Sequence, residues 1–380
     1  MTAKKIFFLS ILVFSFLQCL TGECRNMENL STGDNIYCQD DTIIVHFLAP
    51  RKVLSTAVYN GGYREDLQGL LNHHSSGGNK GMTFEIYEQE MQELIKKLGY
   101  NPMLMSAMGT GVPMKNAVIE KEKYKDVTVT AIVTAGVAGN SGRIGDPAHF
   151  EGFSNKEIMP APGTINIILL IDADMNGGVM ARSLVTATEA KTAALQELII
   201  GSKYSSGLAT GTGTDQMIII ANPQSEVVVQ DTGKHNKIGE LIGRVVKKAV
   251  KLAIFKHNGI DEKVQHSFLR RAERFSITKE SIFHNSVKKL SRPNFDSILN
   301  KIDQDDFFVV ETSLYFYLLD QYSWNLLGIE EVRIGCEGIL NNLSQHYGVP
   351  KEKVGDRSKE GLVLLLEKLV GNVINMRGAS

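Results

Sequence analysis

TINIILLIDADM at positions 164–175 is the stretch from which the fold can be worked outward. Its middle is apolar at nearly every position, which is typical of a strand covered on both faces. A second strand is predicted at 127–138 (VTVTAIVTAGVA), a helix rich in Ala, Leu, Glu and Lys at 179–200, and a third strand at 216–222 (QMIIIAN). This order predicts an α+β layered domain in which helices cover a mixed or mostly antiparallel sheet.

The segments before this core also carry clear signals. NIYCQDDTIIVHFLA at 35–49 has a β-branched centre after a polar turn and predicts one strand or a hairpin. VLSTAVYNGGY at 53–63 predicts a short strand that ends in a turn. TFEIYEQEMQELIKKL at 83–98 has apolar residues at helical spacing, and Gly99 ends that helix.

Helical patterns dominate from residue 237 onward, beginning with KIGELIGRVVKKAVKLAIFKH at 237–257. We therefore expect a signal-like apolar segment or mis-called start at 1–26, a layered domain at 27–258 and a helical C-terminal region at 259–380. The aromatic cluster at 316–324, with the lone Trp324, is interpreted as core packing of that region.

Composition excludes several classes of protein. The chain is 43% hydrophobic and 22% charged with a net charge of -1, so no overall field draws it to nucleic acid or to an anionic membrane. Its four cysteines are too few and too scattered for a disulfide scaffold, and no Cys/His spacing indicates a metal site.

The N-terminus allows two interpretations of where the protein works. Lys4 and Lys5 precede an apolar run at 6–20, and small residues follow, which is the layout of a signal peptide. The run is shorter than the roughly 20 residues of a spanning helix, so no stable membrane anchor is expected. The protein is exported if residues 1–22 are a true signal peptide, and cytoplasmic if translation starts at Met27.

Three polar loops interrupt the apolar strands. They are TAGVAGNSGRIGDPAH at 134–149, IDADMNGG at 171–178 and ATGTGTDQ at 209–216. Glycine lets a backbone approach a ligand closely, so such loops can form an anion or oxyanion cradle, although each loop taken alone is more readily interpreted as an ordinary tight turn. We expect all three to converge with one face of the helix at 179–200 on a single cleft.

Amide hydrolysis is a chemistry that these residues could support. Glu189 lies among small residues in a helix expected to pack on the sheet, and partial desolvation would suit it to acid–base work. Water deprotonated by Glu189 or Asp215 could attack, or Thr212 or Thr214 could attack directly. Surface or structural roles are expected for the histidines, among which His149 is the best catalytic candidate.

The motifs LSTAVYNGGYRED, TAGVAGNSGRIGDPA, GTINIILLIDADM, TATEAKTAALQEL and ATGTGTDQ, in this order, resemble the adenosylcobinamide amidohydrolase family over roughly residues 40–250. The resemblance implies hydrolysis of the aminopropanol amide of adenosylcobinamide, giving adenosylcobyric acid in corrinoid salvage. The corrinoid is then a small-molecule substrate, and no cofactor is identified. A corrin ring with amide arms needs donors and acceptors, for which the candidates are Asn60, Thr134, Asn140, Asp146, Asn166 and Thr186.

Two alternatives stay open. A fainter similarity to self-processing aminopeptidases, whose nucleophile lies in a comparable Gly/Thr loop, would make Thr212 or Thr214 the nucleophile. A corrinoid-binding protein without hydrolysis, working with uptake machinery, is the second. The sequence leaves open the identity of the base, a metal requirement, the oligomeric state and the role of the helical C-terminal region.

Overall fold

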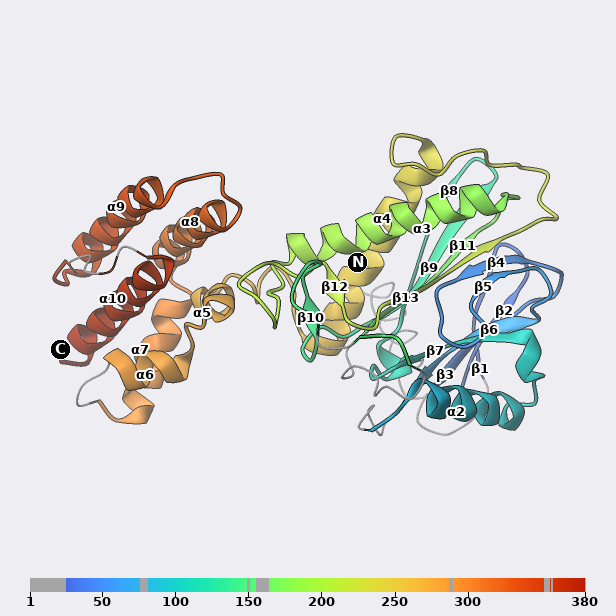
Figure 1. The fold of residues 1–380 in the computed structure, drawn as a ribbon, viewed down its shortest axis with the longest axis horizontal. Coiled ribbons are helices and arrows are strands. Elements are labelled where there is room, and N and C mark those ends of the chain that lie inside the picture. Colours follow the sequence, from blue (N-terminus) through green and yellow to red (C-terminus); the bar gives the residue numbers. More distant parts are fainter. Residues whose placement is uncertain are drawn as a thin grey trace, which may run out of the picture. The chain divides into compact units, whose positions relative to one another are not determined.

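The protein is described by a computed structural model that covers residues 25–75, 81–148, 151–154, 164–286, 290–351, 356 and 358–379. Its contacts divide the chain into two compact units (Figure 1). The layered unit holds the chain up to Ile200 together with Leu208–Asp261, and the helical unit holds Gly201–Gly207 and the chain from Glu262 onward. Residues 1–24, which make up nearly all of the predicted signal-like segment, and His149 lie outside the described residues.

A six-stranded sheet forms the centre of the layered unit, in the order β5-β4-β13-β11-β9-β8. β11 and β13 are parallel, and every other neighbouring pair is antiparallel. The strands are β4 (Lys52–Ser55), β5 (Gly62–Arg64), β8 (Val118–Tyr124), β9 (Val127–Ala135), β11 (Ile165–Ile171) and β13 (Gln216–Ala221).

A second sheet of five strands has the order β1-β2-β3-β6-β7, with β6 and β7 parallel. Its strands are β1 (Arg25–Asn29), β2 (Asn35–Gln39), β3 (Thr42–His46), β6 (Gly69–His74) and β7 (Met105–Thr110). The region predicted as one strand or a hairpin is the hairpin β2–β3. A separate short ribbon pairs β10 (Ser141–Gly142) with β12 (Gly211–Thr212).

Alternation along β11 explains how the layers stack. Ile167 and Leu169 pack with helices α3 (Gly177–Glu197) and α4 (Lys237–Asn258), whereas Ile168 and Leu170 pack against the five-stranded sheet. On the far face of that second sheet lies α2 (Phe84–Lys97). The unit therefore has four layers, helix, sheet, sheet and helix, as Figure 1 shows, and the predicted α+β fold class is confirmed.

The helical unit contains six α-helices within the described part of the chain: α5 (Phe268–Ala272), α6 (Lys279–Ser286), α7 (Arg292–Asp303), α8 (Asp306–Ser323), α9 (Ile329–Tyr347) and α10 (Lys359–Ala379). Phe316 is buried in its core, but Trp324 is 41% exposed, so the prediction that Trp324 packs in the core is wrong. Trp324 directly follows the last residue of α8. None of the helices described is both long and apolar enough to cross a membrane.

Candidate active site

Two of the three predicted loops meet at the end of the sheet where β11 and β13 begin. Ser141 of the first loop lies opposite Thr212 of the third in the ribbon β10–β12. The backbone N–H of Gly213 donates to Oδ1 of Asn140 over 3.1 Å. The Gly/Asn loop and the Gly/Thr loop therefore form one surface, with Asn140 itself almost fully buried between them.

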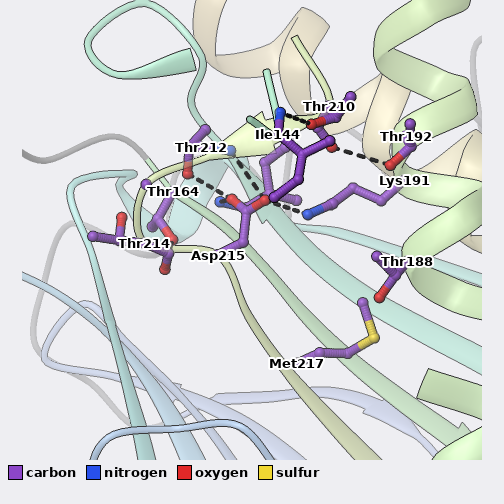
Figure 2. A network of polar contacts seen from close by, with 12 residues as sticks. Ile144, Thr164, Thr188, Lys191, Thr192, Thr210, Thr212, Thr214, Asp215 and Met217 are labelled. Carbon is purple, nitrogen blue, oxygen red and sulfur yellow. Dashed lines mark hydrogen bonds and ion pairs between the residues drawn. The ribbon is translucent and has the colours of Figure 1, made fainter. Parts of the chain in front are cut away.

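The carboxylate of Asp215 is the centre of this surface (Figure 2). Its Oδ1 accepts from the hydroxyl of Thr212 at 2.5 Å and from the backbone N–H of Ile165 at 3.0 Å. Its Oδ2 accepts from the backbone N–H of Thr212 at 3.1 Å and forms an ion pair with Nζ of Lys191. Four donors thus fix the carboxylate in one orientation.

Glycine is required at the position before Thr212. A Cβ on Gly211 would overlap Oδ2 of Asp215 and lie 2.9 Å from Nζ of Lys191. Since neither charged group can move away without breaking the ion pair, a larger residue at this position would displace the site. Gly211 of the TGTGTD motif is therefore needed where the backbone lies directly against the Lys191–Asp215 ion pair.

Lys191 reaches the carboxylate from the buried face of α3. Its side chain is 10% exposed and that of Asp215 is 15% exposed, so the pair is largely withdrawn from water. The hydroxyl of Thr192 donates to the carbonyl oxygen of Thr210 at 3.1 Å, and the amide of Gln196 donates to that of Ala209 at 3.0 Å. These bonds hold the last turns of α3 against the loop that carries Asp215.

The contact between Thr212 and Asp215 is the one with evident chemical use. A threonine hydroxyl is a weak nucleophile until a neighbouring base takes its proton, and here a carboxylate already accepts that proton. Thr212 is only partly buried, so it lies at the edge of the core and not within it. Asp215 has no comparable freedom to activate water, because all its bonding positions are directed at the four donors.

A buried polar network links this cluster to the second sheet. The amide of Asn166 donates to Oδ1 of Asn72 at 2.8 Å and to the carbonyl oxygen of Gly109 at 3.0 Å. The amide of Asn72 donates to Thr134, and the hydroxyl of Thr164 donates to the carbonyl oxygen of Thr214. Both amide protons of Asn166 are therefore bound within the protein. The network fixes the end of the Gly/Thr loop next to β13.

Glu189 is the clearest correction to the sequence analysis. Its side chain is 52% exposed and forms an ion pair with Lys234 at 3.1 Å, so the prediction that it is desolvated is wrong. Successive residues of an α-helix are about 100° apart, which places Glu189 and Lys191 on nearly opposite faces of α3. Lys191, and not Glu189, is the charged residue that the helix brings to Asp215.

The predicted convergence of all three loops is also wrong. The second loop follows β11, whose seven residues separate its two ends by roughly 20 Å. There Asp172 accepts from Asn222, and Asp174 pairs with Lys52 at 2.6 Å. Since α3 begins beside this second loop and ends beside the third, the helix connects the two ends of the sheet.

The remaining candidates hold the protein's own backbone. The amide of Asn60 donates to the carbonyl oxygens of Pro102 and Met105. Thr186 donates to the carbonyl oxygen of Thr232 at 2.8 Å, on a different face of α3 from Lys191. Asp146 accepts from the N–H of Arg143 within a turn of the first loop. Binding of substrate by these side chains stays a prediction.

Sequence reasoning undervalued two residues. Neither Lys191 nor Asn72 is among the candidates that the sequence patterns indicate. Asn72 follows the apolar residues of β6 (GLLN), and its buried side chain faces the six-stranded sheet, where a polar group needs a partner. Burial lowers the pKa of the His257 imidazole. Within the described ranges no group of three or more His, Cys, Asp or Glu side chains is placed to hold a metal ion.

Comparisons with known proteins point to one family. The sequence profile of a family described as adenosylcobinamide amidohydrolase matches residues 27–262. An uncharacterized protein of Methanocaldococcus jannaschii is 34% identical over 238 residues, which are 60% of this chain and 91% of that protein. The matched region contains the Asp215 cluster and ends near the start of the helical unit.

Solved structures give weak matches. A protein of Pyrococcus horikoshii OT3 is 13% identical with a TM-score of 0.27, covering 57% of this chain and 77% of that one. The L-aminopeptidase D-Ala-esterase/amidase of Ochrobactrum anthropi is 12% identical with a TM-score of 0.26, covering 62% and 82%. Similarities of this size support no argument about fold or chemistry.

Proposed function

Because the chain belongs to the adenosylcobinamide amidohydrolase family, we propose that it hydrolyses the amide joining the aminopropanol arm to the corrin ring of adenosylcobinamide. The products are adenosylcobyric acid and aminopropanol. The observation that carries the proposal is a hydroxyl, a carboxylate and an ammonium group in direct contact inside the matched region. These are the groups that amide hydrolysis needs for attack, proton transfer and charge stabilisation.

Thr212 is the proposed nucleophile. Its oxygen attacks the amide carbon while its proton passes to Oδ1 of Asp215, along the hydrogen bond that joins them. The carbon–nitrogen bond then breaks, and the same proton leaves with the amine. The products of this half-reaction are free aminopropanol and an ester between Thr212 and the corrinoid acid. Water hydrolyses the ester, with Asp215 again accepting and returning a proton.

Lys191 has two roles in this scheme. Its ammonium group holds the Asp215 carboxylate toward Thr212, and it balances the negative charge of the pair before attack. When the proton moves to Asp215, the ammonium group is left with an unpaired positive charge beside the reacting carbon. That charge stabilises the negative oxygen that develops in the tetrahedral intermediate, in a region already largely screened from water.

The test is hydrolysis of adenosylcobinamide by purified full-length protein, with adenosylcobyric acid and aminopropanol followed by mass spectrometry. Thr212→Val removes the nucleophile and keeps the shape, so turnover should fall by roughly 10³-fold, and Thr212→Ser should restore part of it. Glu189→Gln, on the exposed face of α3, is the matched control and should turn over at the wild-type rate.

Two results would contradict the proposal at different levels. Wild-type turnover by Thr212→Val would remove the covalent mechanism but leave the hydrolase. Tight binding of adenosylcobinamide with no products would instead indicate a corrinoid-binding protein. Intact-protein mass spectrometry after rapid acid quenching gives a direct readout, because the ester adds the corrinoid acyl mass to wild-type protein and not to Thr212→Val.

A further inference from the structure

A rigid turn borders the Asp215 cluster. The N–H of Asp146 donates to the carbonyl oxygen of Arg143 at 3.0 Å, and Gly145 has the positive φ of +90° that this turn requires. The carboxylate of Asp146 accepts from the N–H of Arg143, whose guanidinium donates to the carbonyl oxygen of Leu208 at 3.2 Å. The turn is thus fixed both internally and to the neighbouring loop.

Ile144 occupies the tip of this turn. Its N–H donates to the hydroxyl of Thr210 at 2.9 Å, two residues before Thr212, and Figure 2 shows it in the same group of contacts. Its side chain is nevertheless 86% exposed. The hydrogen bonds therefore fix the backbone from which this apolar residue extends into water, beside the loop of the proposed nucleophile.

Single exposed apolar residues are ordinary on protein surfaces, so exposure alone carries no argument. The distribution here is different. Among the large apolar side chains that the structure describes, Phe153 at 91% and Ile144 at 86% are the two most exposed, and the next, Leu326, is 65% exposed. Both belong to the connection between β10 and β11, which leaves the site at Gly142.

We infer that Ile144 is a specificity-determining residue, which contacts the apolar surface of the corrin ring while the scissile amide reaches Thr212. The inference rests on the proposed function. The amide lies on a short arm of the ring, so the ring must lie against the protein beside Thr212 whenever the amide carbon meets the hydroxyl. A fixed apolar side chain there fits the ring, whereas the polar cluster fits the amide.

The experiment compares Ile144→Asp with Leu48→Asp in the full chain. Leu48 is the matched control, because it is 61% exposed, its N–H is bound to Oδ1 of Asp34, and it lies near the opposite end of β11. For adenosylcobinamide, Ile144→Asp should raise KM about 10-fold and keep kcat within about 2-fold of wild type. The reason is that the contact with the ring is the same in the bound substrate and in the transition state. Leu48→Asp should leave both constants unchanged.

Two further measurements separate this inference from the proposed function. On a small N-(2-hydroxypropyl) amide without the ring, Ile144→Asp and wild type should show the same kcat/KM, whereas a misfolded turn would lower both substrates' rates equally. Equilibrium binding of adenosylcobinamide needs no turnover, and Ile144→Asp should weaken it about 10-fold.

Each outcome is decisive. Hydrolysis by wild type with an unchanged KM in Ile144→Asp overturns the inference and leaves the function standing. Weakened binding in Ile144→Asp without hydrolysis by any variant supports the inference and removes the function. Equal losses on the ring-bearing and ring-free substrates, or no binding of adenosylcobinamide to wild type, overturn the inference.

Discussion

The two ends of β11 each carry a buried ion pair, and the pairs differ in what surrounds them. At the start of the strand, Lys191 and Asp215 are 10% and 15% exposed and share their contacts with the hydroxyl of Thr212. Near the other end, Arg51 and Asp34 are 1% and 0% exposed. Burial of charge is common to both, so burial alone does not identify a reactive site. A threonine hydroxyl donates to the carboxylate at both ends, Thr212 to Asp215 and Thr32 to Asp34 at 2.7 Å, so the two pairs differ in their burial and in the other contacts of the cation.

The contacts of Arg51 show a purely structural pair. Its guanidinium donates twice to the carboxylate of Asp34, once each to the carbonyl oxygens of Pro50 and Thr32, and once to Asn222. All five N–H donors of Arg51 are bound within the protein, so none is left to meet a substrate. Such a pair fixes strands together, whereas the Lys191–Asp215 pair fixes a nucleophile.

The largest effect on stability is therefore expected at the structural end. Arg51→Met should cost about 3–5 kcal/mol in free energy of unfolding, because the Asp34 charge stays buried without its cation. Turnover per folded molecule should stay at the wild-type value. Urea unfolding followed by circular dichroism measures the first, and activity titrated against folded protein measures the second.

The chain provides its own control for this measurement. Trp324 is the sole tryptophan and lies in the helical unit, so its fluorescence reports that unit and not the layered one. An Arg51→Met protein that kept wild-type stability, or that lost turnover in its folded fraction, would break the distinction between the two ends.

Lys191→Met should give the reverse pattern. Asp215 keeps three of its four donors, so the expected loss of stability is smaller, about 1–3 kcal/mol. Turnover should fall by roughly 10²-fold or more, because the positive charge beside the reacting carbon is gone. Denaturation and kinetics on the same preparation test both. A Lys191→Met enzyme with wild-type kcat would show that the pair is structural at this end too.

The sequence predicted the elements well because β11, β9 and β13 are buried strands with strong apolar runs. It could not predict which face of α3 meets the sheet. The buried residues of that helix are mostly small, including Ser183, Thr186, Ala187 and Ala190, so hydrophobicity does not mark the face. Without that mark, the sequence analysis chose Glu189, whereas tertiary packing brings Lys191 to Asp215.

The convergence of loops failed for a related reason. Loops before and after a strand look alike in sequence, since both are rich in Gly, Asn and Asp. The parallel pairing of β11 with β13 puts the residues before both strands at one end and those after both at the other. Asp215 therefore shares an end with Thr164, and Asp174 lies at the opposite end. Pairing direction is a long-range property that local patterns do not contain.

Two of the charged pairs of α3 can be compared by double-mutant cycles. Glu189 and Lys234 are 52% and 62% exposed, so their coupling energy should be below about 0.5 kcal/mol, and salt should reduce it further. The Lys191–Asp215 cycle should give about 1–3 kcal/mol. Urea unfolding of the single and double variants at low and at high salt measures both couplings. Equal coupling in the two cycles would mean that partial burial adds nothing to the pair at the site.

The smallest effect is expected at Glu197, the last residue of α3. Its carboxylate accepts side-chain bonds from Lys247 and from Lys251, each at 2.8 Å. These bonds, that of Lys247 first, lower the pKa of the carboxyl below its ordinary value of 4.5. Since the unfolded chain takes up this proton first as the pH falls, the contribution to stability is complete above 4.5 and is lost as the pH falls through the folded-state pKa. The carboxyl is 42% exposed, so screening by water keeps the effect small. Urea midpoints of wild type and Glu197→Gln should therefore differ slightly at pH 7 and converge in acid. A difference that grew in acid would show that the two lysines do not stabilise the ionised form.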